Sequence, residues 1–303
     1  MAILVAVALL AFVMGVAIQR GTTCAVLAVE ELLRHRRADR FLGFFECGLW
    51  AALSLSVLGA QPASALFESP LLSLLGGACL FGLGATLNGA CAFGTIARLG
   101  NGRLEYLLTA ATAWMVIAAI SSLGWSRVPD PNALSNGVMA AALAVGLLVS
   151  VMLVRWRVRR RRLRSFVTLG ALMAIIGVAG AMLAVIHQPW PWMNTLAALP
   201  DVGMASAVGL LALIFGAMAS GVVGGQFRVS APSATAIVRR IGGGALMGAG
   251  TALVPGGNDA LILYGIPQGD ARALGAYLVM LSTIAAALII TGGLPSAWRA
   301  RGA

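Results

Sequence analysis

Two cysteines stand in short polar interruptions of otherwise apolar sequence, and they are the residues best suited to chemistry. Cys24 ends the run QRGTTC (19–24), and Cys91 ends the run NGAC (88–91). A thiol is a weak hydrogen-bond donor without a fixed charge, and the free backbone N–H groups at a helix break suit an anion. The first half of the chain therefore offers a candidate anion path whose members are Cys24, Cys91, Gln19, Arg20, Thr23 and Asn88.

A third interruption, PGGND (255–259), adds Gly257, Asn258 and Asp259 to this candidate path. An ionisable group at membrane depth costs about 2.5–3.5 kcal/mol on insertion scales, which makes Asp259 a functional candidate. Its carboxylate would repel an anion unless it is protonated or paired, so proton coupling is one hypothesis. The alternative is structural, with Asn258 or Asp259 capping a helix that begins after Pro255.

The remaining cysteines, Cys47 and Cys79, are interpreted as small apolar residues of helices. None of the four cysteines forms a CxxC motif, so neither a disulfide framework nor a redox dithiol is indicated. We expect no metal site and no cofactor. Trp190 and Trp192 follow an apolar run, and we expect them in an aromatic belt at the outer interface.

The composition requires a membrane to position these residues. Hydrophobic residues make up 60% of the chain and charged residues 10%, against about 25% charged in a soluble domain. A spanning helix needs about 20 apolar residues, and runs of that kind predict an all-α polytopic membrane protein of about nine spans. These runs are 2–19, 41–60, 71–97, 104–124, 134–154, 165–187, 204–223, 241–265 and 273–293.

All 21 cationic side chains are Arg, and most lie between apolar runs. Seven lie within 155–164 and four within 34–40. In a membrane protein such blocks mark the cytoplasmic side and contact lipid headgroups, so the net charge of +11 does not indicate nucleic-acid binding. With nine spans, both blocks fall on one side of the membrane.

The two broken runs resemble each other. Residues 76–91 read GGACLFGLGATLNGAC and residues 242–257 read GGGALMGAGTALVPGG, with glycines and leucines matching at a constant offset of 166. A kink followed by a half-length helix is expected at 19–33, and a segment of the same shape at 224–240. We therefore predict a single membrane domain of two inverted halves, 1–125 and 165–303, joined by residues 126–164.

The segments GVAIQRGTTCAVLA (15–28) and GLGATLNGACAFGTIARLGNG (82–102) resemble the signatures of the YeeE/YedE family of bacterial sulfur-compound transporters. The resemblance implies a helical bundle of the bacterial inner membrane, pinched at its centre, which passes a small sulfur-containing anion such as thiosulfate along thiols. It implies that Cys24 and Cys91 are two stations of that relay, and that a small cytoplasmic sulfur carrier of the TusA type is a partner. Weak donors suit this task, because conduction requires binding weak enough to release.

One position departs from the family pattern. The usual third cysteine falls opposite Cys91 in the second half, where this chain has Gly257. The departure leaves open a different small sulfur species as substrate. A membrane enzyme that acts on thiols is a further alternative, but no CxxC pair, quinone pocket or cofactor motif is visible for it. A non-catalytic subunit that anchors a soluble complex through its Arg-rich loop is another, but it would leave the paired breaks unexplained.

Overall fold

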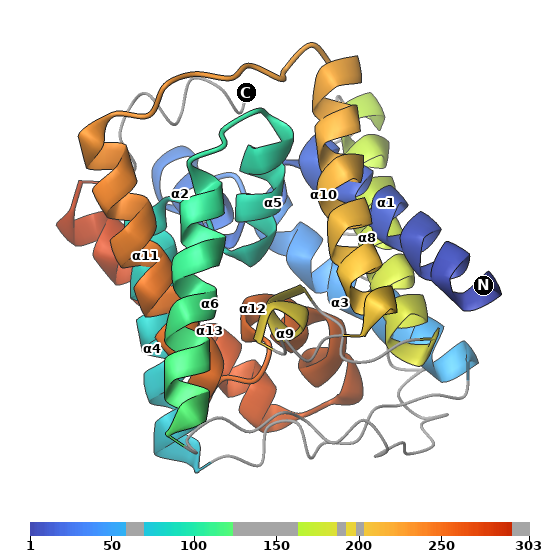
Figure 1. Ribbon diagram of the computed structural model, residues 1–303. Coiled ribbons are helices and arrows are strands. Elements are labelled where there is room, and N and C mark those ends of the chain that lie inside the picture. The colour runs from blue at the N-terminus through green and yellow to red at the C-terminus, as the bar shows by residue number, and fades with distance from the viewer. Residues whose placement is uncertain (59–69, 124–162, 187–191, 198–202, 293–303) are drawn as a thin grey trace.

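The computed structural model describes residues 1–58, 70–123, 163–186, 192–197 and 203–292 (Figure 1). The expected span 134–154, Trp190 and most of the Arg-rich run 155–164 lie outside the described residues. Within them, the elements are α1 (Ala2–Gly21), α2 (Ala25–His35), α3 (Asp39–Val57), α4 (Leu71–Asn88), α5 (Ala92–Gly100), α6 (Tyr106–Ser122), α8 (Leu163–Ile186), α9 (Trp192–Ala197), α10 (Met204–Val223), α11 (Ala234–Leu253), α12 (Gly257–Ala260), the π-helix η2 (Leu261–Gly265), the 3-10 helix η3 (Ile266–Gln268) and α13 (Ala271–Ile290).

Every secondary-structure element in the described part of the chain is a helix, as the composition predicts. Six stretches of it are long and apolar enough to cross a membrane, and α6 is a shorter apolar helix. These stretches are Ala2–His35, Asp39–Val57, Leu71–Gly100, Leu169–Ile186, Met204–Val223 and Ala271–Ile290. Large apolar side chains such as Leu9, Leu72 and Phe215 are exposed on the outer surface, as expected for helices in contact with lipid. The protein is therefore a multi-pass membrane protein.

The long helices pack in pairs around four short ones. Helix α1 packs on α10, and α3 packs on α8. In the same way α4 packs on α13 and α11 on α6, while α4 and α11 contact each other directly. Figure 1 shows α2 and α5 enclosed in the upper part of the molecule, with α9 and α12 enclosed below them.

Glycines allow α4 and α11 to approach closely. A Cβ atom added at Gly84 would lie 2.8 Å from the carbonyl oxygen of Gly243, and one added at Gly250 would lie 2.7 Å from that of Gly77. Real Cβ atoms do not come so close, so side chains at these four places would push the helices apart. Small residues at helix crossings are the expected way to pack helices in lipid.

The predicted breaks are present, and each contains a residue with positive φ. Thr22 (φ 46°) separates α1 from α2, and Gly89 (φ 71°) separates α4 from α5. Gly256 (φ 81°) lies between α11 and α12, and Gly257 (φ 67°) is the first residue of α12. The half-length helix expected after the first kink is confirmed as α2.

The second kink expected at 224–240 is wrong. Residues 226–233 form an exposed connection without a helix, and α11 begins at Ala234 with Ser233 as its N-cap. Polar residues at 224–233 are therefore explained by contact with the aqueous phase rather than by a buried break. The short helix that enters the bundle in the second half is α9, whose contacts include α6, α10 and α12.

Candidate functional site

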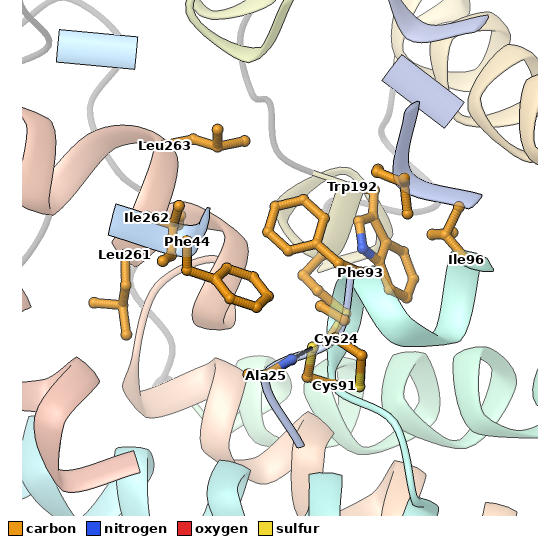
Figure 2. Packing of buried hydrophobic residues seen from close by; sticks show 14 of the residues in the cluster. Cys24, Ala25, Phe44, Cys91, Phe93, Ile96, Trp192, Leu261, Ile262 and Leu263 are labelled. Atoms are coloured by element: carbon orange, nitrogen blue, oxygen red, sulfur yellow. Dashed lines mark hydrogen bonds between the residues drawn. The ribbon is translucent and has the colours of Figure 1, made fainter. Parts of the chain in front are cut away.

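Cys24 and Cys91 meet at the centre of the bundle. Each is the last non-helical residue before a half-helix, Cys24 before α2 and Cys91 before α5. Both side chains are buried, and the N–H of Ala25 donates to Sγ of Cys91 at 3.2 Å. The two thiols are close enough to influence each other, and Figure 2 shows their side chains next to each other. The structure thus brings together two residues that are 67 positions apart in the chain.

The environment of the thiol pair is electropositive, and the Arg98 guanidinium in the last turn of α5 lies within electrostatic range of Cys24. The backbone N–H of Leu27 faces Cys24, and that of Gly94 faces Cys91. These groups belong to the first turns of α2 and α5, where N–H groups lack partners within their own helix. The positive ends of two helix dipoles therefore converge on the sulfur atoms. Such a place can hold a small anion or a polarised sulfur species.

Gly94 makes room for this arrangement. A Cβ atom added there would lie 2.6 Å from Sγ of Cys24, 3.0 Å from its Cβ and 3.1 Å from Cβ of Ala90. Only glycine at this position lets α5 lie against the Cys24 thiol. Gly94 lies within the segment 82–102 that resembles the family signature, but its steric role could be found only from the packing.

Asn88 fixes the loop that carries Cys91. Its Nδ2 donates to the carbonyl oxygen of Ala90 at 2.8 Å and to Oγ1 of Thr95 at 3.2 Å. Its Oδ1 accepts from Oγ1 of Thr109 at 2.8 Å and from Nη1 of Arg240 at 3.3 Å. The side-chain amide is fully buried and engaged on both sides, so in this structure it shapes the break and is not open to a ligand.

Gln19 and Arg20 lie away from the thiol pair. Nε2 of Gln19 donates at 2.7 Å to Oδ1 of Asn101 and to Oε1 of Gln226, and its Oε1 accepts from Ser220 at 2.6 Å. Asn101 follows the far end of the nine-residue helix α5, about 13 Å from Cys91 at 1.5 Å per residue. Arg20 is exposed and donates to Oγ of Ser220 at 3.3 Å. Both residues therefore mark the end of the bundle where α1 and α10 end.

Thr23 is the member of the first kink that stays near Cys24. It is buried, and its Oγ1 has no hydrogen-bond partner among the residues described. A buried hydroxyl usually finds a partner. The residue before Cys24 therefore carries a hydroxyl donor that no described residue uses.

The second break lies against the first. Oδ1 of Asn258 accepts from the N–H of Ala92, the residue after Cys91, at 3.3 Å. Gly257 takes φ 67°, and a Cβ atom added there would lie 2.9 Å from Phe81, so the backbone at this place does not suit a cysteine. Asp259 is fully buried, and within the described residues neither of its carboxyl oxygens has a hydrogen-bond partner.

Two aromatic residues of the second half belong to the same region and were missed. Trp192 is 4% exposed and packs in the buried cluster that contains Phe93 and both thiols (Figure 2), so its expected place in an interfacial belt is wrong. Tyr264, on η2, is 3% exposed and lies within electrostatic range of the Asp259 carboxyl. The sequence offset of 166 could have identified this region, because it makes α9, which begins at Trp192, the counterpart of α2.

The other two cysteines do not extend the site, and the acidic and histidine side chains of the described residues do not assemble a metal centre. Cys47 is buried within α3, and Sγ of Cys79 accepts from Oγ1 of Thr283 at 3.6 Å, so neither thiol joins the pair. In the described ranges no three His, Cys, Asp or Glu side chains gather as a metal ion would require.

Comparison with known proteins adds one match. The profile of a family described as Sulphur transport matches residues 20–288, which is most of the chain and includes both thiols and the second break. No match was found among curated proteins.

Proposed function

The chain belongs to the sulphur transport family, and from that membership we propose that it is a permease for a small sulfur-containing anion, thiosulfate first. The observation that supports the proposal most is the thiol pair at the facing starts of α2 and α5. Sulfur donors bind a sulfur-bearing anion weakly, and the helix ends offset its charge. Membership of this family also favours a transporter over an enzyme.

In the proposed path the anion passes a central constriction lined by Cys24, Cys91 and the second break. Thr23, Gly257, Asn258 and Asp259 border the thiols, and Asn88 keeps the Cys91 loop in place. Gln19 and Arg20 lie at the Arg-rich end of the bundle. There the Arg20 guanidinium would attract the anion before it enters the constriction or after it leaves. The irregular backbone at this depth is consistent with such a path, because non-helical backbone in a membrane is tolerated where protein encloses it.

We further propose that the two halves, 1–125 and 165–303, form an inverted repeat. The offset of 166 relates Gly77 to Gly243 and Gly84 to Gly250. Gly77 approaches Gly250 while Gly84 approaches Gly243, which is the reciprocal pattern of a two-fold contact. The order α1 to α6 also matches α8 to α13, because the α1–α10 contact corresponds to α8–α3 and the α4–α13 contact to α11–α6. Helices that cross antiparallel at a two-fold contact support halves of opposite orientation.

The nine-span arrangement and the location in a bacterial inner membrane belong to the same proposal. Arg34, Arg98, Arg103 and Arg239 lie at helix ends on the side where α2 and α5 end, which we assign to the cytoplasm by the positive-inside rule. A cytoplasmic sulfur carrier of the TusA type would meet the protein on this side, which the Arg residues make attractive to an acidic partner.

A second candidate, a different small sulfur species, is favoured by one observation. Gly257 stands where the family pattern has a thiol, and its positive φ and its closeness to Phe81 oppose a side chain there. A path with two thiols has one thiol fewer to bind thiosulfate than the family pattern has. If selectivity for thiosulfate depends on the third thiol, a related sulfur anion would be the better substrate.

Uptake into proteoliposomes tests the proposal. The purified protein would be reconstituted and offered labelled thiosulfate, sulfite and sulfate in separate assays, with empty liposomes as the control. We expect saturable uptake of at least one sulfur anion, with thiosulfate preferred. Uptake of none would contradict a permease, while chemical conversion of the anion without net flux would favour the enzyme alternative.

A further inference from the structure

The second half repeats the thiol site with different side chains. Adding 166 to Ala25 and Ala92, the first residues of α2 and α5, gives positions 191 and 258, at the starts of α9 (Trp192–Ala197) and α12 (Gly257–Ala260). Helices α9 and α12 contact each other, as α2 and α5 do. Where the first half places two thiols, this counterpart places the polar side chains of Trp192, Asn258, Asp259 and Tyr264.

Polar atoms of these four side chains lack hydrogen-bond partners in the described part of the chain. They are Nε1 of Trp192, Nδ2 of Asn258, both carboxyl oxygens of Asp259 and the hydroxyl of Tyr264. None of the four residues is more than 4% exposed. Buried polar atoms without partners destabilise a fold, so a group of them on contacting segments indicates a place built to receive something polar.

The amide of Asn258 shows what kind of group is expected. Its Oδ1 accepts from the N–H of Ala92, which fixes the orientation of the amide because only oxygen can accept there. The group left over is therefore Nδ2, a donor. Nε1 of Trp192 can only donate, and the Tyr264 hydroxyl can donate.

From this arrangement we propose that Trp192, Asn258 and Tyr264 form a subsite for the oxygen atoms of an oxygen-bearing sulfur anion, while Cys24 and Cys91 receive its terminal sulfur. The inference rests on the proposed function and adds to it the three side chains that hold the oxygen atoms of the anion. The connection between the two subsites is short, because Asn258 is bonded to the residue that follows Cys91.

Asp259 completes the subsite as a proton carrier. The backbone N–H of Met193, next to Trp192, lies near its carboxyl group, without the geometry of a hydrogen bond. The ionisable groups on the elements packed against α12 are Tyr264 on η2, Cys91 and Arg98 at the two ends of α5, and Arg239 and Arg240 on α11. The described residues of α9 contribute none. A carboxylate would repel a bound oxyanion, so the carboxyl group is protonated when the anion is present and then acts as a further donor.

The test measures binding to the full-length protein in detergent by titration calorimetry at neutral pH, with thiosulfate and hydrosulfide as the two ligands. The variants are Trp192→Phe and Tyr264→Phe, alone and combined, which remove the donors and keep the rings. Trp50→Phe is the matched control, because Nε1 of Trp50 is also buried without a partner in the described structure but lies on α3 against α8. Thermal unfolding checks that the variants fold.

We expect the double variant to bind thiosulfate about tenfold or more weakly, with hydrosulfide binding and the Trp50→Phe control unchanged. Unchanged thiosulfate binding would mean that these donors hold only water, and an equal loss for both ligands would mean a general structural effect. Either result overturns the subsite and leaves the permease standing. Binding of hydrosulfide alone by the parent protein would also overturn it, whereas binding of neither ligand would contradict the proposed function itself.

Discussion

Replacing Gly94 by alanine perturbs the thiol pair without changing either cysteine. The added methyl group would lie 2.6 Å from Sγ of Cys24, whereas ordinary contact begins at 3.4 Å. The thiol or helix α5 must therefore shift by about 0.8 Å. Because the neighbouring contacts with Cβ of Cys24 and of Ala90 are 3.0 and 3.1 Å, the helix has little freedom to move aside.

The destabilisation caused by Gly94→Ala is measured relative to a matched glycine. A Cβ atom added at Gly76, on α4, meets nothing within 4 Å, so Gly76→Ala reports the general effect of alanine in a helix. Overpacking in a well-packed interior costs about 1–3 kcal/mol. We expect Gly94→Ala to be less stable than Gly76→Ala by this amount, and its thiosulfate uptake to fall about tenfold or more, since misplacement by 1 Å can cost up to about a hundredfold in a positioned site.

The assay combines proteoliposome uptake with thermal unfolding and adds a double-mutant cycle. In a Cys24→Ala background the contact at 2.6 Å no longer exists, so the destabilisation by Gly94→Ala should shrink by about 1 kcal/mol. Parent-like uptake by Gly94→Ala, or a cost that is independent of Cys24, would refute the claim that α5 is held against a functional thiol.

Three further predictions concern the surroundings of the thiols. Asn88→Leu leaves Thr109 and Arg240 without the acceptor they share. It should destabilise the protein by about 3 kcal/mol or more, seen as a lower unfolding temperature and as faster alkylation of Cys91. Unchanged Cys91 reactivity would contradict the role of Asn88 in holding the loop. Asp259→Asn should remove a rise of uptake toward acidic pH, since the amide cannot exchange a proton, and an identical pH profile in parent and variant would rule out coupling. Gly84→Leu should prevent close packing of α4 on α11 and abolish stable expression, whereas Gly275→Leu, at a position with nothing within 4 Å of an added Cβ atom, should be tolerated.

The sequence was sufficient to predict a helical membrane protein and breaks at both thiols, because each depends on local patterns. Apolar length predicts spans, and a glycine or polar residue inside such a run predicts a break. Both thiols could be assigned to breaks for this reason. The contact between the two thiols could be expected only in general terms, because no local sequence pattern indicates that α2 and α5 begin next to each other.

The second-half site was harder to predict because its elements are short and their signals ambiguous. Helix α9 has six residues and follows tryptophans that are typical of an interface, so Trp192 was assigned to the membrane surface. The polar residues at 224–233 resemble the first kink in composition, yet they are exposed. Composition alone cannot distinguish a buried helix break from a connection exposed to water. Applying the offset of 166 to every element of the first half does distinguish them, because it predicts where each counterpart in the second half lies.

Uptake by a double cysteine variant tests the central claim most directly. Cys24→Ser with Cys91→Ser removes both sulfur atoms with little change in volume, and Cys47→Ser with Cys79→Ser is the control with the same number of changes away from the pair. We predict that labelled thiosulfate uptake into proteoliposomes falls to the level of empty liposomes in the first variant and stays near that of the parent in the second. Uptake that persists without Cys24 and Cys91 would contradict a path through the thiol pair.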